Sequence, residues 1–186
     1  MSLIKKLFIC AALLFSAAAP ALAGEPITDP ENTLIMQLKT GRVVIAMRPD
    51  LAPQHVKRIK ELVRKGFYDG TPFHRVIDGF MAQGGDPTGT GRGGSGFKLP
   101  AEFSNQHHLR GTVSMARAQD PNSADSQFFI CFEAAPSLDG KYTIWGRVIE
   151  GMENVDQIKK GDESDNGVVS NPDHIISMKV AADVKQ

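Results

Sequence analysis

After residue 32 the chain carries many short, mostly apolar runs bounded by turn signals, which are typical of β-strands, and residues 73–78 alternate with a period of two. Two such runs flank Thr40-Gly41, a turn signal, and therefore predict a β-hairpin. Glycine- and proline-rich turns separate the later runs. The predicted strands are residues 34–38, 43–47, 73–77, 80–83, 112–116, 127–132, 142–148 and 175–180.

Two stretches have a helical rather than a strand period. In residues 53–65, Val56, Ile59 and Val63 fall on one face, and Gly66 is a plausible C-cap. Residues 152–160 carry acidic side chains early and lysines late, which suits the helix dipole. Many short strands with two helices favour an antiparallel barrel or a sandwich, and the pattern alone leaves both open.

The sequence TPFHRVIDGFMAQGGD, residues 71–86, combines polar and apolar side chains most densely. Two strands joined at Asp78-Gly79 would bring Arg75 and Gln83 beside Phe80 and Met81. The result would be an apolar slot with two strong hydrogen-bonding groups at its edge. From this stretch alone, a core hairpin with a solvated arginine is an alternative interpretation.

The first 23 residues have the pattern of a cleavable signal peptide. Lys5 and Lys6 precede an apolar run, residues 7–19, and Ala21-Leu22-Ala23 fits an A-x-A cleavage site. We expect cleavage after Ala23 and export to the periplasm. A lipid anchor at Cys10 fits less well, because this cysteine lies inside the apolar run.

Cleavage would leave about 163 residues, which suits one domain. We expect a flexible segment at 24–32 and a single domain at 33–186. No later stretch is long and apolar enough for a membrane helix, so no stable membrane association is expected. Cys131 would be the single remaining cysteine, and its apolar neighbours indicate a buried side chain rather than a nucleophile.

Charge and motifs exclude several classes of function. Without the two leader lysines the chain has 19 basic and 21 acidic side chains, a net charge of −2, which argues against nucleic-acid binding. Residues 84–96 contain a G-x-G-x-x-G pattern, but Pro100 follows where a nucleotide site needs a helix, so we interpret them as a flexible loop. His107-His108 is interpreted as a solvated turn, since adjacent strand residues point to opposite faces and no ligand set surrounds them. We expect no metal and no cofactor.

Several separated motifs, in the same order, resemble the cyclophilin family of peptidyl-prolyl isomerases. They are 73–77 (FHRVI), 79–81 (GFM), 83–86 (QGGD) and 126–130 (SQFFI). The resemblance runs from about residue 33 to 180. It implies a closed eight-stranded antiparallel barrel capped by two α-helices. It also implies a monomer that isomerises X-Pro bonds in unfolded or partly folded polypeptides.

The resemblance assigns roles to particular residues. Arg75, Phe80 and Gln83 match catalytic positions, with Arg75 as the catalytic arginine. The matched substrate-binding positions are Ile77, Met81, Ala116, Arg117, Gln127, Phe129, Leu138 and Tyr142. This chain departs from common family members at Arg117 (usually Asn), Tyr142 (often His) and Ser137 (Trp in cyclosporin-sensitive members). Weak cyclosporin binding is therefore expected.

The implied reaction has a simple physical requirement. Rotation about an X-Pro bond has a barrier of about 18–20 kcal/mol, set by amide resonance. A site that binds the twisted amide better than either planar form lowers this barrier, and a fixed guanidinium suits that task. The rival hypotheses are a non-catalytic chaperone that binds Pro-containing peptides and a structural barrel without a peptide site. A requirement for Arg75 would favour catalysis, because holding a peptide needs no charge at the twisted amide.

Overall fold

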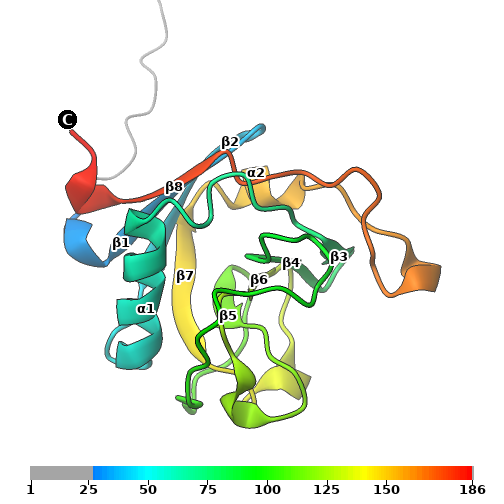
Figure 1. Ribbon diagram of the computed structural model, residues 1–186, viewed down its shortest axis with the longest axis horizontal. Helices are drawn as coiled ribbons and strands as arrows, with labels where there is room; N and C mark the ends of the chain where they lie inside the picture. The colour runs from blue at the N-terminus through cyan, green and yellow to red at the C-terminus, as the bar shows by residue number, and fades with distance from the viewer. Residues whose placement is uncertain (1–26, 186) are drawn as a thin grey trace, which may run out of the picture.

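The computed structural model describes residues 27–185, which form one eight-stranded antiparallel sheet with two α-helices (Figure 1). The strand order is β3-β4-β6-β5-β7-β2-β1-β8. Most observed strands begin or end within two residues of the predicted ones. The strands are β1 (Thr33–Leu38), β2 (Gly41–Met47), β3 (Arg75–Ile77), β4 (Met81–Gly84), β5 (Thr112–Met115), β6 (Phe128–Cys131), β7 (Ile144–Glu150) and β8 (Ser177–Val180).

The sheet does not close into the barrel that the family resemblance implied. β3 and β8 are its two edge strands and form no ladder with each other. The segments before them are joined by isolated contacts, including Gly70 N to Ile175 O at 2.7 Å and Phe73 N to Asp173 O at 2.9 Å. Pro72 lies in this seam and has no N–H to donate to a ladder. The expectation of a closed barrel was therefore wrong, and the sheet is an open half-barrel of eight antiparallel strands.

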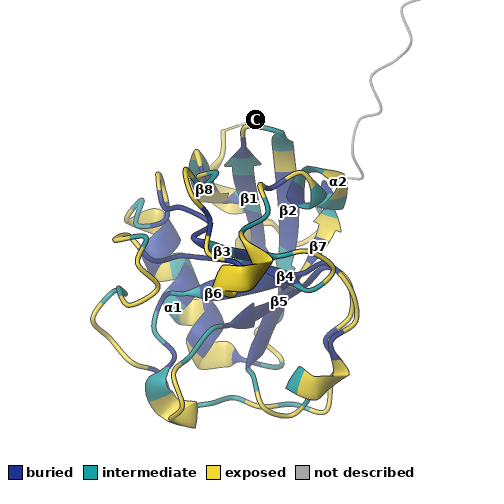
Figure 2. Cartoon of the chain, turned by 90° about the vertical axis from the view of Figure 1, so that its right-hand side faces the viewer, coloured by how far each residue is buried: buried dark blue, intermediate teal, exposed yellow. Residues whose placement is uncertain are grey.

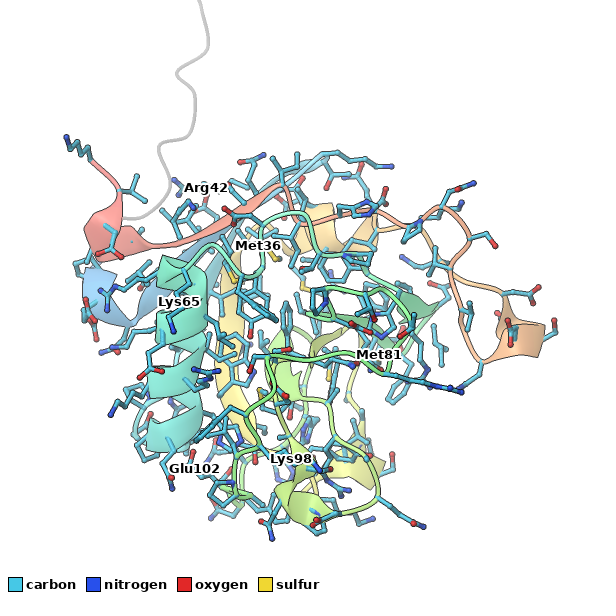
Figure 3. All side chains as sticks on the ribbon, viewed as in Figure 1. Met36, Arg42, Lys65, Met81, Lys98 and Glu102 are labelled. Atoms are coloured by element: carbon cyan, nitrogen blue, oxygen red, sulfur yellow. The ribbon has the colours of Figure 1, made fainter. Side chains whose placement is uncertain are left out.

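Helix α1 (Pro53–Arg64) lies at one end of the half-barrel and confirms the helix predicted at 53–65. Its N-cap residue, Ala52, provides no side-chain hydrogen bond. Glu102, from a distant loop, takes that role: its carboxylate accepts from the backbone N–H groups of Gln54 and His55, both at 3.1 Å. Figure 3 shows Glu102 beside the lower end of α1 and Lys65 at the upper end. A carboxylate here satisfies free N–H groups and suits the helix dipole.

Helix α2 (Met152–Asp156) is shorter than the stretch predicted at 152–160. The side-chain amine of Lys160 turns back and donates to the carbonyl oxygens of Asp156 and Ile158. A side chain that satisfies these carbonyls replaces the backbone donors that a longer helix would supply. Within residues 27–185, no helix combines the length and hydrophobicity that spanning a bilayer requires.

The main core lies between the concave face of the sheet and the helices, and Figure 2 shows most strands in the dark blue of buried residues. Phe128 is at the centre of an aromatic cluster. Its ring makes edge-to-face contacts with Tyr68, Phe73 and Trp145, at centroid distances of 5.7, 6.5 and 5.9 Å. Such contacts stabilise a core beyond the area that they bury.

Strand alternation produces a second, smaller apolar cluster on the other face of the sheet. Along β6, Phe128 and Ile130 join the main core, whereas Phe129 and Cys131 join the second cluster. Along β4, Met81 likewise belongs to the second cluster, while the next residue belongs to the core. Because successive side chains point to opposite faces, a strand buried on one side presents a separate apolar surface on the other.

Candidate active site

A pocket of about 200 Å³ lies on this second apolar surface, over β3, β4, β6 and the loop before β7. Its position brings together residues from four separate parts of the sequence. The pocket is lined by Arg75, Phe80, Met81, Gln83, Ala116, Arg117, Phe129, Leu138 and Tyr142. All nine were predicted as site residues from the sequence.

The β3–β4 hairpin places the polar edge of the pocket. Arg75 lies directly opposite Gln83 in the ladder, and Ile77 lies opposite Met81. This register aligns the two polar side chains, so that Nη1 of Arg75 donates to Oε1 of Gln83 at 3.2 Å. Ile77 packs against the apolar cluster from β3 but does not line the pocket.

Aromatic and aliphatic side chains form the rest of the wall. Met81 and Phe129 are almost fully buried, at 1% and 5% exposure, so little of each is left to a ligand. The ring of Tyr142 meets that of Phe129 edge to face at 5.8 Å. Leu138, from a single 3₁₀ turn at Pro136–Leu138, packs against the same cluster. A pocket that combines a wall of aromatic and aliphatic side chains with polar groups at its edge suits a small apolar ring attached to a polar amide.

A chain of hydrogen bonds leads away from Arg75 along the site. Nε2 of Gln83 donates to Oε1 of Gln127 at 2.9 Å, and Nε2 of Gln127 donates to the carbonyl oxygens of Gly91 and Gly93 at 3.1 and 2.8 Å. Gln127 therefore lies next to the pocket described above rather than in its wall. It lines a second pocket, of about 440 Å³, which shares Gln83, Ala116 and Arg117 with the first.

The loop at residues 84–96 flanks the second pocket, but it is not the free loop that its composition suggested. The buried Asp86 carboxylate accepts from Thr88 N, Gly91 N and Gly93 N at 2.8, 2.7 and 3.1 Å. Burial alone would raise the pKa of Asp86, but these hydrogen bonds outweigh it and lower the pKa. Asp125 holds the end of the loop by accepting from Ser95 N at 2.7 Å. The loop is thus anchored through its backbone donors.

The Arg117 side chain connects the segment after β5 with the segment before β7. Its Nε and Nη2 donate to the carbonyl oxygen of Lys141, and its Nη1 donates to those of Ala118 and Gln119. The guanidinium also stacks over the ring of Tyr142. Arg117 and Tyr142, two of the three positions where the sequence departs from the pattern of the family resemblance, are therefore in contact with each other.

The two adjacent histidines do not form the solvated turn that we expected. His107 is exposed, but the His108 side chain is fully buried. Their Nδ1 atoms lie 2.7 and 3.0 Å from the two carboxylate oxygens of Asp139, so they converge on one group. This segment is not a strand, and strand alternation therefore does not separate them. Burial lowers the pKa of His108, against the raising effect of Asp139.

The His108 side chain also packs against Phe129, one of the pocket residues. Its ring is stacked on that of Phe129 at a centroid distance of 6.1 Å, and its Nε2 lies 3.1 Å from Oγ of Ser114. His108 and Ser114 are buried and Asp139 is partly exposed, so this hydrogen-bonded chain runs from the surface to a position behind Phe129. His74, directly before β3, is also buried, and burial lowers its pKa.

Sequence reasoning missed one residue that contacts Arg75. Nε of Arg75 donates to the backbone oxygen of Asn166 at 3.0 Å, and Nη2 donates to its side-chain Oδ1 at 2.9 Å. Asn166-Gly167 is a turn dipeptide, a signal that could have indicated a left-handed backbone. That signal says nothing about a contact with a residue 91 positions earlier.

Among residues 27–185, no group of three or more His, Cys, Asp or Glu side chains is placed to hold a metal ion. Cys131 lies buried beneath the pocket, as predicted, and burial raises the pKa of its thiol to about 12. The neutral thiol is a poor nucleophile. The geometry offers binding, orientation and a fixed cation, rather than covalent chemistry.

Comparison with known proteins agrees with this geometry. The family model for "Cyclophilin type peptidyl-prolyl cis-trans isomerase/CLD" matches residues 33–180. A protein of Brucella suis named "Probable peptidyl-prolyl cis-trans isomerase" is 51% identical and covers 95% of this chain and 96% of its own length. A peptidyl-prolyl cis-trans isomerase of Synechococcus elongatus is 42% identical, over 80% of this chain and 96% of its own length.

Solved structures show the same fold. A cyclophilin from Hirschia baltica superposes with a TM-score of 0.75 at 32% identity, over 84% of this chain and 76% of its own. A cyclophilin-type isomerase of Cryptosporidium parvum, solved in the presence of the dipeptide Ala-Pro, gives 0.72 at 32% identity, over 80% of this chain and 98% of its own. Fold, pocket and sequence agree, and the chain belongs to the cyclophilin family of peptidyl-prolyl cis-trans isomerases.

Proposed function

We infer that this isomerase acts on X-Pro bonds of exported polypeptides while they fold, with Arg75 stabilising the twisted amide. The observation that carries the inference is a charged guanidinium fixed at the edge of a small apolar pocket. In this arrangement the proline ring enters the space beside Phe129, Met81 and Leu138. The prolyl amide then lies at the polar edge, next to Arg75.

The hydrogen bonds of Arg75 leave donors available for a substrate. A guanidinium has five N–H groups. Three of them donate to Gln83 and Asn166, which leaves one on each terminal nitrogen. Burial lowers the pKa of Arg75, but a guanidinium remains protonated near neutrality. A fixed charge in a partly dehydrated site stabilises a developing lone pair more strongly than a charge in water does.

The isomerase assay on an X-Pro peptide tests this mechanism. We expect Arg75→Ala to lower kcat by about 10²- to 10³-fold, as the loss of one preorganised donor does in other enzymes. Arg75→Lys should also be poor, because a compact ammonium cannot copy the planar fork. Exhaustive chelation should leave the wild-type rate unchanged. A fully active Arg75→Ala protein would remove Arg75 from the mechanism, and an inactive wild type that binds peptide would favour a chaperone role.

The proposal of export rests on the leader-like pattern of residues 1–23, which lie outside the described part of the chain. We propose cleavage after Ala23 and a periplasmic location, with Pro-containing polypeptides as substrates and a monomeric enzyme. Cell fractionation followed by mass determination of the N-terminal peptide tests the first two points. Recovery of the uncleaved chain from the cytoplasm would contradict them. Size-exclusion chromatography with light scattering tests whether the enzyme is monomeric.

A further inference from the structure

We propose that Asn166 is the positioning residue of Arg75, and that it sets the rate of isomerisation through the orientation of the guanidinium. This inference rests on the role of Arg75 given above and deepens it. Asn166 does not line the pocket, so its effect on a substrate passes through Arg75.

The guanidinium is held from two directions. On one side, Gln83 accepts from Nη1 at 3.2 Å. On the other, Asn166 accepts from Nε at 3.0 Å through its backbone oxygen and from Nη2 at 2.9 Å through Oδ1. An arginine side chain otherwise has about 2 kcal/mol of rotamer freedom. Three hydrogen bonds to three different nitrogens fix both the position and the plane of the fork.

The backbone of Asn166 explains how one residue can supply two acceptors. Its φ of 51° lies in the left-handed region, which asparagine adopts more readily than most residues. A 3₁₀ turn at Glu163–Asp165 precedes it, and the Asp162 side chain caps that turn by accepting from Ser164 N. The turn ends at Asn166, where the reversed backbone presents the main-chain carbonyl and the side-chain amide to the same partner.

The segment that carries Asn166 is hydrogen-bonded to the edge of the sheet. It covers the outer edge of β3: Val76 N donates to Gly167 O at 2.8 Å, Gly161 N donates to Val76 O at 2.9 Å, and Val169 N donates to His74 O at 3.1 Å. In Figure 1 this orange segment extends to the right of β3 and β4. Because β3 is an edge strand of three residues, this segment supplies the hydrogen bonds that a neighbouring strand would provide.

Close packing fixes the register of this segment. A Cβ on Gly161 would lie 1.9 Å from Gly167 O, and one on Gly167 would lie 2.5 Å from Cγ1 of Ile77. These approaches leave no room for any side chain at either glycine. The packing therefore also fixes the position of Asn166, which directly precedes Gly167, beside Arg75.

This geometry determines which kinetic constant should change. A donor that is already oriented costs no reorganisation as the amide twists, so its placement acts on the transition state. Asn166 contributes no wall to the pocket, so ground-state binding of the peptide should change little. Loss of the Asn166 side chain should therefore lower kcat and leave KM nearly constant.

The sharpest variant is Asn166→Gly. Glycine adopts the left-handed backbone without strain and keeps the carbonyl acceptor, so the variant removes Oδ1 alone. The matched control is Asn171→Gly. Asn171 is also exposed and left-handed, with φ of 52°, but its backbone oxygen accepts from the Lys159 amine rather than from Arg75.

We expect Asn166→Gly to lower kcat by about 10- to 150-fold, the effect of one hydrogen bond to a charged group. KM and thermal stability should stay close to wild type, and Asn171→Gly should match wild type in both kinetic constants. In NMR spectra, the Arg75 Nε–H signal, identified by its loss in Arg75→Ala, should broaden or exchange faster in Asn166→Gly. An unchanged kcat and an unchanged Arg75 signal would each overturn the inference.

A double-mutant cycle separates this inference from the proposed mechanism. If Asn166 acts through Arg75, adding Asn166→Gly to Arg75→Ala should cause no further loss. A full additional loss would mean that Asn166 acts by another route. An impaired Arg75→Ala with a fully active Asn166→Gly would overturn the role of Asn166 alone. A fully active Arg75→Ala would overturn the mechanism on which that role rests.

Discussion

The guanidinium carbon of Arg117 lies 4.5 Å from the centre of the Tyr142 ring, over its face. The same guanidinium donates to the carbonyl oxygen of Lys141, the residue directly before Tyr142, from Nε at 3.2 Å and from Nη2 at 2.9 Å. Arg117 therefore holds residues 141–142 in place through the backbone carbonyl of Lys141 and the ring of Tyr142. Together with Gln83 and Ala116, it lines both pockets.

We expect Arg117→Ala to weaken peptide binding more than turnover. A cation–π contact at an exposed site contributes about 0.5–1 kcal/mol, and a typical hydrogen bond contributes a similar amount. KM should rise by about 3- to 10-fold, because the wall that meets the peptide is loosened while Arg75 stays in place. Steady-state kinetics on a Pro-containing peptide measures this. Arg147→Ala, an exposed arginine on β7 that lines neither pocket, is the matched control. A variant that lost kcat at constant KM would assign Arg117 to the chemistry instead.

Catalysis should vary little between about pH 6 and 8. The proposed acting group is a guanidinium, which does not titrate in this range. Burial lowers the pKa values of the nearby histidines, His74 and His108, which moves their titration away from this range. The measurement is kcat/KM across this range for wild type and His74→Ala. A bell-shaped profile that His74→Ala abolishes would show that an imidazole takes part in the reaction.

Stability, unlike activity, should fall as the pH drops below about 6.5, the ordinary pKa of histidine. Burial lowers the pKa of His55, His74 and His108 in the folded state. Below pH 6.5 the unfolded chain therefore binds more protons at these histidines than the folded chain does. Each such histidine reduces the free energy of unfolding by up to about 1.4 kcal/mol per pH unit until its folded-state pKa is reached.

Chemical denaturation between pH 7 and 5 tests this expectation. In His108→Gln, the free energy of unfolding should depend less steeply on pH than in wild type, whatever the substitution does to stability at pH 7. The pKa of Asp139 is lowered, first of all by its hydrogen bond with His107, and its stabilising effect is lost only at still lower pH. Equal slopes for His108→Gln and wild type would show that His108 does not cause the acid loss.

Cyclosporin should inhibit this protein weakly, because Ser137 occupies the position that the family resemblance assigns to Trp. Ser137 is exposed on the 3₁₀ turn before Leu138, and its carbonyl accepts from the Lys141 amine at 3.1 Å. An indole there would add a large apolar wall and an N–H donor, worth about 1.5–3 kcal/mol by analogy with other fully buried large side chains.

Titration of isomerase activity with cyclosporin, for wild type and Ser137→Trp, measures the difference. The substitution should raise sensitivity by about 10-fold or more, and peptide turnover should change much less, since Ser137 does not line the pocket. Tight inhibition of the wild type would contradict the expectation. A folded and active Ser137→Trp protein without any gain in sensitivity would contradict it as well.

Local periodicity in the sequence brought Arg75 and Gln83 beside Phe80 and Met81, and the family resemblance assigned the other pocket residues. Alternation along β6 sends Phe128 into the core and Phe129 to the pocket, and the Asp78-Gly79 turn sets Arg75 opposite Gln83. Such relationships join residues a few positions apart, and the pleat of a strand or the length of a turn determines them. For that reason the hairpin and the main helix could be predicted from the local pattern, whereas the rest of the apolar wall was predicted from the family resemblance.

Only the tertiary structure decided the contacts between distant segments. Asn166 holds Arg75, Glu102 caps α1, and His108 lies buried under Phe129. Each depends on the path of an irregular loop, where no repeating period relates position in the sequence to direction in space. The open edge of the sheet has the same origin, since Pro72 interrupts hydrogen bonding where a barrel would close. Sequence thus determined which side chains the site contains, while the loops decided what holds them in place.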